Sequence, residues 1–191
     1  MSDNFIQNTN EEEKELKTGM VAIIGRPSAG KSTFLNTACQ EEVSIVSPIP
    51  QTTRNAIKGI VNTSFGQLIF IDTPGYHDSD KKLNLRLKNV TETQLEDIDC
   101  VLYVLDSTRV PGNEEIHTAQ LIKKHANKTV IAINKIDSKE SKIQPIRRFI
   151  KDTLPQIPQE RIFEMSAQKD IGINEVLKAL YDIAPIAPPM Y

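Results

Sequence analysis

The sequence predicts an α/β fold in which a mainly parallel sheet carries helices on both of its faces. Short apolar runs alternate along the chain with segments whose apolar residues recur at helical spacing. The runs 100–105 and 129–133 show no polar alternation, which is typical of strands covered on both sides. Each polar motif of the chain also follows a predicted strand. Parallel sheets bind their ligands at the carboxyl ends of their strands, where these motifs would lie.

Length and composition indicate one soluble globular domain from a reducing compartment. A chain of 191 residues can bury a substantial core without disulfides. Cys39 and Cys100 lack the spacing of metal ligands, so we expect reduced thiols in a cytoplasmic protein. No apolar run reaches membrane-spanning length, and no signal-peptide pattern opens the sequence. The net charge of −2 disfavours a strongly basic nucleic-acid surface.

The two ends of the chain differ in composition from the segment between them. Residues 1–18 are polar and acidic, so we expect a disordered tail without chemistry. The domain itself is expected to span residues 19–183. Residues 184–191 contain three prolines and predict a stiff linker.

The predicted elements follow in a regular order. Strands are predicted at 21–24, 55–61, 67–71, 100–105, 129–133 and 161–165. Helices are predicted from Lys31 onward and at 113–125, 143–154 and 173–183, and helical spacing also resumes at Leu83, Leu87 and Val90. The second and third strands are so close in the chain that we expect a hairpin, which gives this six-stranded sheet one antiparallel edge. Residues 41–54 show no periodicity and are expected to form a loop.

The segment between the first strand and the first helix has the pattern of a phosphate-binding loop. Gly25 is followed by four residues and then by Gly30-Lys31-Ser32. Two glycines let successive backbone N–H groups point inward around a chain of phosphates, at a helix N-terminus that favours anions. Lys31 would neutralise the outer phosphates, and the Ser32 hydroxyl suits a magnesium ion that bridges two of them. These residues predict a P-loop NTPase fold.

A second motif, Asp72-Thr73-Pro74-Gly75, ends the third predicted strand. The Asp72 carboxylate would reach the neighbourhood of Ser32, where it could orient magnesium directly or through water. Gly75 could present its backbone N–H to a terminal phosphate without a side chain in the way. In isolation, an ordinary turn after a strand would explain the motif equally well.

A third motif, Asn134-Lys135-Ile136-Asp137, predicts the base. A carboxylate at Asp137 accepts hydrogen bonds from N1–H and the exocyclic amine of guanine, whereas adenine offers a lone pair at N1. A site of this kind prefers guanine by roughly 10⁴ or more. Asn134 and the Lys135 stem are expected to brace the loop and cover the ring, and Ser166-Ala167 fits a backbone contact to the guanine carbonyl.

Together these motifs resemble the GTPase superfamily, and within it the Era family of bacterial ribosome-assembly GTPases. The resemblance covers residues 20–191, and its more specific parts are Gly25-Arg26-Pro27, residues 50–54 and residues 72–75. It implies that Thr53 closes over magnesium and the terminal phosphate. It also implies that residues 41–54 and 73–82 are two switches, which become disordered when the γ-phosphate is lost. It also implies a monomer with slow turnover that binds small-subunit ribosomal RNA through a following KH domain, which these residues do not contain. Peripheral attachment to the membrane stays open.

The predicted site combines residues from all of these motifs. The nucleotide-binding residues are Gly25, Arg26, Pro27, Ser28, Ala29, Gly30, Lys31, Ser32, Thr33, Asp72, Thr73, Pro74, Gly75, Tyr76, Asn134, Lys135, Ile136, Asp137, Ser166 and Ala167. The predicted magnesium ligands are Ser32, Thr53 and Asp72, and the predicted catalytic residues are Lys31, Thr53 and Gly75.

Two positions depart from related enzymes. Tyr76 stands where Ras-like enzymes carry a glutamine that orients the attacking water. Ser28 stands where the Era family usually has an asparagine that is associated with an activating potassium ion. Stimulation by potassium therefore stays open. Arg26 and Arg54 either neutralise transition-state charge or are simply exposed. The leading hypothesis is a slow GTP-hydrolysing switch. The alternatives are a binding module that signals by nucleotide occupancy alone and a Der-type or tRNA-modification GTPase domain, while Asn134 and Asp137 disfavour an ATP-using enzyme.

Overall fold

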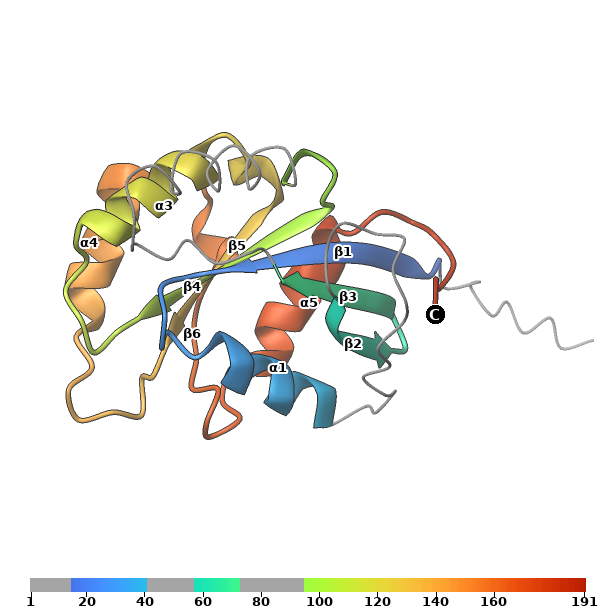
Figure 1. The fold of residues 1–191 in the computed structure, drawn as a ribbon, viewed down its shortest axis with the longest axis horizontal. Coiled ribbons are helices and arrows are strands. Elements are labelled where there is room, and N and C mark those ends of the chain that lie inside the picture. The colour runs from blue at the N-terminus through green and yellow to red at the C-terminus, as the bar shows by residue number, and fades with distance from the viewer. Residues whose placement is uncertain (1–14, 41–56, 73–94) are drawn as a thin grey trace, which may run out of the picture.

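The structure is a computed structural model that describes residues 15–40, 57–72 and 95–191 (Figure 1). The strands are β1 (Lys17–Ile24), β2 (Ile57–Thr63), β3 (Gly66–Asp72), β4 (Cys100–Asp106), β5 (Thr129–Asn134) and β6 (Ile162–Glu164). The helices are α1 (Lys31–Gln40), α3 (Asn113–Lys123), α4 (Ile143–Thr153) and α5 (Ile173–Ile183), with short 3₁₀ turns η1 (Ala126–Lys128) and η2 (Gln159–Arg161).

The six strands form one sheet in the order β2-β3-β1-β4-β5-β6. β1 pairs in parallel with β3 on one side and with β4 on the other, and β5 and β6 continue the parallel part. β2 and β3 form the antiparallel hairpin at one edge. The predicted fold class, a mainly parallel sheet with one antiparallel edge and helices on both faces, is therefore confirmed.

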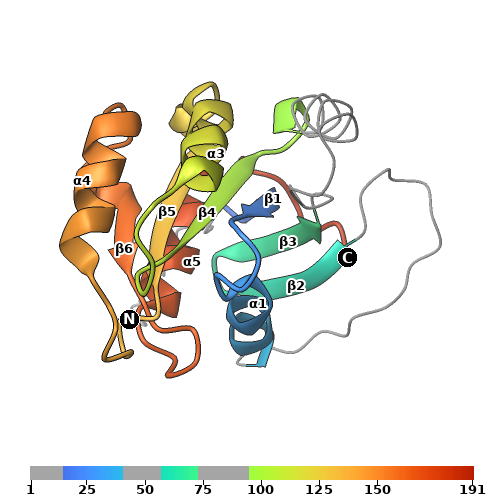
Figure 2. The same ribbon diagram turned by 60° about the vertical axis from the view of Figure 1, so that its left-hand side comes forward.

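Helices cover both faces of this sheet and divide the core into two layers. Figure 1 shows α3 and α4 on one face and α1 and α5 on the other, and the buried apolar residues separate in the same way. Phe34 of α1 meets Phe70 of β3 edge to face, with ring centroids 5.8 Å apart. In the turned view of Figure 2, α4 lies beside β6, to which the pair Arg147–Glu164 joins it. Every residue of β4 and β5 is buried, as the absence of polar alternation in these runs predicts.

Two predicted boundaries are wrong. The tail predicted at 1–18 overlaps β1, which begins at Lys17. Thr18 is fully buried, and its N–H donates to the carbonyl of Pro185 at 3.0 Å. The last strand is also shorter than the predicted 161–165. Arg161 ends η2, and Met165 leaves the sheet after its N–H has donated to Ile133. In both cases a partner distant in sequence sets the end of the strand.

The proline-rich segment 184–191 packs against the start of β1 and the start of β3. Its residue Ala187 donates to the carbonyl of Leu16 at 3.1 Å and accepts the Thr18 hydroxyl at 3.1 Å. The buried amide of Gln67 accepts from the N–H of Tyr191 and donates to its carbonyl. The C-terminus accordingly lies beside β2 and β3 (Figure 2). A linker role for this segment stays a prediction.

Some expectations fall outside the described residues. They are the loop at 41–54, residues 55 and 56 of the second strand, the helical spacing at Leu83, Leu87 and Val90, and the switch at 73–82. No helix in the described part of the chain is long and apolar enough to cross a membrane. Both cysteines are free, and burial raises the pKa of the Cys100 thiol to about 12, which makes it a poor nucleophile.

Replacing Tyr181 with phenylalanine is expected to lower the free energy of unfolding by roughly 1 kcal/mol. The Tyr181 hydroxyl is buried and lies 3.1 Å from the carbonyl oxygens of both Val61 and Gly66, so its loss leaves these acceptors without that donor. Urea denaturation followed by circular dichroism measures the change.

Tyr103→Phe is the matched control for this substitution. The Tyr103 hydroxyl is also buried, but it has no hydrogen-bond partner among the residues that the structure describes. Burying an unpaired polar group costs free energy, so Tyr103→Phe should leave stability unchanged or raise it. Equal losses in the two variants would contradict this assignment of the two hydroxyls.

Candidate functional site

Residues 25–30 connect β1 to α1 at the carboxyl ends of the strands and, with the first two residues of α1, form the phosphate loop at 25–32. Two close approaches explain its glycines. Gly25 has a φ of 157° and Gly30 a φ of 98°. A Cβ atom on Gly25 would lie 2.4 Å from the carbonyl oxygen of Val104, and one on Gly30 would lie 2.2 Å from Nδ2 of Asn134. Any side chain at either position would push the loop away from β4 or β5.

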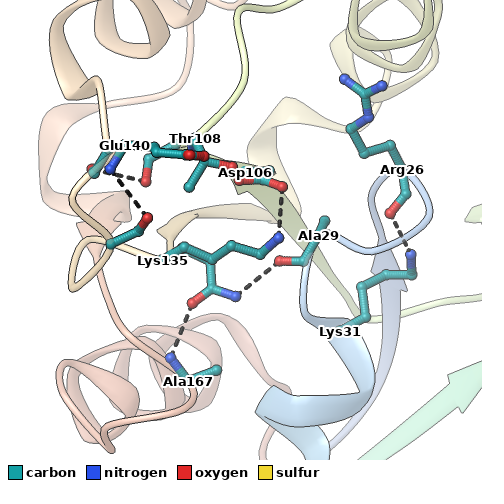
Figure 3. A network of polar contacts seen from close by, with 12 residues as sticks. Arg26, Ala29, Lys31, Asp106, Thr108, Lys135, Glu140 and Ala167 are labelled. Carbon is teal, nitrogen blue, oxygen red and sulfur yellow. Dashed lines mark hydrogen bonds and ion pairs between the residues drawn. The ribbon is translucent and has the colours of Figure 1, made fainter.

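Lys31 is folded back over this loop. Its Nζ donates to the carbonyl oxygen of Gly25 at 2.7 Å. It also donates to the carbonyl oxygen of Arg26 at 2.9 Å, as Figure 3 shows. The ammonium group thus lies above the bend of the loop, at the N-terminus of α1, where backbone N–H groups and the helix dipole favour an anion. Ser32 and Thr33 follow on the exposed side of the same turn.

Asn134, the last residue of β5, joins the loop at 25–32 to the loop after β6. Its Nδ2 donates to the carbonyl of Ala29 at 2.8 Å, and its Oδ1 accepts from the N–H of Ala167 at 2.9 Å (Figure 3). The side chain is only 2% exposed, so both hydrogen bonds are made away from water. Thr37 of α1 adds a bond from its hydroxyl to the Ala167 carbonyl at 2.8 Å. Three sequence motifs therefore meet around one buried amide.

Asp137 is exposed, and Ser166 orients it. The fully buried Ser166 donates its hydroxyl to Oδ1 of Asp137 at 2.7 Å, while the N–H of Ile136 donates to the Met165 carbonyl at 3.3 Å. Sequence reasoning assigned Ser166 a backbone contact to a ligand. The structure shows that its side chain also fixes the carboxylate of the neighbouring motif.

Asp106 is a site residue that sequence reasoning missed. It ends β4 opposite Asn134 of β5 and is 5% exposed. Lys135, in a left-handed backbone conformation with φ of 67°, donates its Nζ to Oδ2 of Asp106 at 2.7 Å (Figure 3). Thr108 donates its N–H and its hydroxyl to Oδ1 at 2.9 and 2.6 Å. The available signal was its position after a buried apolar run, which it shares with Asp72 and Asn134.

These contacts decide the charge of the buried carboxyl. Burial by itself disfavours the ionised form of Asp106 and raises its pKa. The hydrogen bonds from Lys135 and Thr108 outweigh burial and hold the pKa of Asp106 below its ordinary value. Lys135 is therefore held by an anion that stays ionised at neutral pH.

The remaining predicted residues divide into those near the loop and those outside the described part of the chain. Asp72 ends β3 and pairs in register with Ile23, one residue before the end of β1. Arg26 is not a freely exposed arginine, because its Nη1 lies 2.8 Å from Oε1 of Glu115 in α3. The residues that lie outside the described ranges are Thr53, Arg54, Thr73, Pro74, Gly75, Tyr76 and His77.

The Asp106 contacts predict a specific pH dependence of stability. A carboxyl whose folded pKa is depressed contributes stability above its unfolded pKa of about 4, and this contribution is lost as the pH falls through the lower folded value. Asp106→Asn keeps an oxygen for Thr108 but removes the charge, so it should flatten the acid limb of the stability curve. Unfolding free energies of both chains between about pH 5 and pH 2 test this. Parallel curves would contradict it.

Comparison with known proteins finds relatives of this chain by sequence and by fold. The family model described as 50S ribosome-binding GTPase matches residues 20–135. GTPase Era of Treponema denticola is 57% identical over 176 residues, which cover 92% of this chain and 60% of that relative. The crystal structure of an Aquifex aeolicus Era variant bound to GDP.AlF4- is similar with a TM-score of 0.68, at 33% identity over 92% of this chain.

A second solved structure, Era in complex with MgGDPNP and nucleotides 1506–1542 of 16S ribosomal RNA, is similar with a TM-score of 0.70 at 33% identity. This chain spans about 60% of the length of each of these three relatives. The family model covers more than half of the chain, and the Treponema denticola relative covers more than nine-tenths of it. The chain therefore belongs to the GTPase Era family.

Proposed function

We propose that this chain is the guanine-nucleotide-binding part of a slow, magnesium-dependent GTPase that acts as a molecular switch. The observation that carries the proposal is the pair of hydrogen bonds made by Asn134, which ties the phosphate loop at Ala29 to Ala167. One buried side chain thereby sets the spacing between the segment for the phosphates and the segment for the base. A ligand that reaches both must carry a base at one end and phosphates at the other.

The phosphate end of the ligand would be held by the loop at 25–32 and by Lys31. In the structure the Lys31 ammonium bonds the carbonyls of Gly25 and Arg26. Phosphate oxygens are stronger acceptors than these neutral carbonyls, because a hydrogen bond between two charged groups gains Coulomb energy. The lysine can then turn from the loop to the β- and γ-phosphates and neutralise charge there.

The base end would be recognised by Asp137. Ser166 holds one of its carboxylate oxygens at 2.7 Å, which restricts the orientation of the group before a ligand arrives. A carboxylate in this orientation accepts from N1–H and the exocyclic amine of guanine together. Adenine lacks this pair of donors and would leave the carboxylate without partners, which favours GTP and GDP over ATP.

Magnesium would be bound by Ser32, Thr53 and Asp72. The exposed Ser32 at the start of α1 and the end of β3 at Asp72, beside β1, fit this donor set of hard oxygens. Bound magnesium would neutralise the charge that develops on the phosphate oxygens. Thr53 and the N–H of Gly75 would sense the γ-phosphate, while water attacks it in line.

A second candidate, binding without hydrolysis, is favoured by two residues. Tyr76 follows Gly75 and cannot orient water as a glutamine does. Ser28 has a φ of 65°, a left-handed conformation that asparagine tolerates better than serine. The Era family usually carries asparagine there, a residue associated with an activating potassium ion, and the shorter serine favours a chain without this activation.

For the full-length protein we propose a role in assembly of the small ribosomal subunit. A relative of this chain has been solved with a segment of 16S ribosomal RNA. Binding of that RNA would require the KH domain that the family resemblance implies, which residues 1–191 do not contain. We further propose a monomer that acts in the cytoplasm, with attachment to the membrane surface as the alternative.

Incubation of excess chain with radiolabelled GTP and magnesium tests hydrolysis. We expect phosphate release above the no-protein control, and Lys31→Ala should slow it by roughly tenfold or more because it removes a charged hydrogen bond to phosphate. Retention of GTP on a filter without phosphate release would instead support the occupancy module. Equal retention of ATP would contradict both.

Asp137→Asn tests the base site. An amide cannot accept from both guanine donors, so GTP affinity should fall by roughly 100-fold or more, while affinity for xanthosine triphosphate should rise. Asp152→Asn, at an exposed position of α4, is the matched control and should bind GTP like the wild type. Competition titrations with a fluorescent GDP analogue give the affinities. Unchanged GTP affinity in Asp137→Asn would exclude this carboxylate as the determinant.

A further inference from the structure

The first turn of α3 reaches across to the phosphate loop and holds one of its side chains. Nη1 of Arg26 lies 2.8 Å from Oε1 of Glu115, and its Nε lies 3.4 Å from Oε2 of Glu114. Figure 3 shows the Arg26 side chain directed away from Lys31, although the Arg26 carbonyl points toward it. We call the three residues Arg26, Glu114 and Glu115 the α3 clasp.

Glu115 is the fixed member of the α3 clasp. Its side chain is 7% exposed, and a carboxylate this far from water is stable only when it is paired and hydrogen-bonded. Its Oε2 accepts from the N–H of Gly112 at 2.7 Å, which caps the start of α3, while Oε1 is left to Arg26. The helix N-terminus also favours a negative charge at this position. α3 therefore holds the anion in place, and the anion holds the arginine.

The backbone of Arg26 transmits this anchorage to the site. Its carbonyl oxygen accepts Nζ of Lys31 at 2.9 Å and the N–H of Ala29 at 3.2 Å, so it lies at the bend of the phosphate loop. From the other side, Asn134 holds the next part of the loop through the Ala29 carbonyl. The loop is thus fixed between β5 and α3 by two bonds.

The charge balance argues against a direct role of the guanidinium at the phosphate. One cation faces two carboxylates, so its charge is already compensated on the side of α3. If the guanidinium itself acted on phosphate, these carboxylates would compete for it, and removing one of them would raise activity. A positioning role predicts the opposite sign.

We propose that Glu115 is a positioning residue for nucleotide binding: through Arg26 it fixes the phosphate loop, and with it Lys31, against α3. The proposal rests on the proposed function, in which this loop binds the phosphates of GDP and GTP. It adds a residue outside every motif of the sequence to the determinants of nucleotide release.

Three variants of the 191-residue chain test the α3 clasp. Glu115→Gln keeps an oxygen for the Gly112 N–H but removes the charge, Arg26→Ala removes the partner, and the third variant combines both. Stopped-flow dissociation of fluorescent GDP and of a fluorescent GTP analogue should be faster by roughly tenfold or more in each, which is the loss expected for a hydrogen bond between charged groups. Both singles weaken the Arg26–Glu115 pair, and Arg26→Ala also removes the pair with Glu114, so the double variant should be no faster than Arg26→Ala alone.

A second ion pair provides the matched control. Arg147 of α4 and Glu164 of β6 form a pair at 2.6 Å that touches none of the predicted site residues. Glu164→Gln should leave nucleotide dissociation unchanged, although it removes the same kind of charge. Thermal melts of all variants separate a general loss of stability from the loss at the loop.

Hydrogen exchange of amides 25–33 in the nucleotide-free chain provides a readout that needs no ligand. Both single variants should exchange these amides faster than Glu164→Gln does.

If the wild type bound no GDP, the proposed function would fail, while faster exchange would still support the α3 clasp. Unchanged exchange and dissociation in folded Glu115→Gln, additive effects in the double variant, or faster hydrolysis in Glu115→Gln would each overturn it. If Glu115→Gln does not fold, Arg26→Ala, judged by exchange and dissociation, decides alone.

Discussion

The candidate site depends on the two hydrogen bonds of the buried Asn134 amide. Its donor holds the phosphate loop and its acceptor holds the loop after β6, and at 2% exposure neither bond has water as a substitute. The contact also explains a glycine 104 positions earlier, since a side chain on Gly30 would meet the Asn134 amide nitrogen. Two motifs that seem independent along the chain are therefore halves of one contact.

The sheet makes this contact possible because it places the carboxyl ends of strands that are distant in sequence next to one another. Asp106 and Asn134 are register partners at the carboxyl ends of β4 and β5, strands in which every residue is buried. Because β4 and β5 are fully packed, they hold the polar residues at their ends in fixed positions. Lys135 then reaches Asp106 from the neighbouring strand, and the loop of Asp137 lies beside the loop of Ser166.

The cations of the site are held before any ligand binds. Lys31 donates to two backbone carbonyls, Lys135 bonds Asp106, and Arg26 bonds Glu115. Phosphate oxygens are stronger acceptors than the backbone carbonyls of Gly25 and Arg26, so an incoming phosphate can draw the Lys31 ammonium away from them. Arg26 and Lys135 have fixed anionic partners and are suited to holding loops in position. Such an arrangement keeps the site ordered before a ligand binds.

The sequence by itself determined the order of strands and helices, the antiparallel edge and the presence of motifs for phosphate and base, because these follow from periodicity, glycine geometry and donor chemistry within short segments. Only the tertiary structure decided which partners the motif residues take. Asp106 and Glu115 belong to no motif, Ser166 orients Asp137 by its side chain, and β1 begins at Lys17 beside the segment 184–191. Each of these depends on residues far apart in the chain, and local pattern carries no information about which distant groups the fold brings within hydrogen-bonding distance.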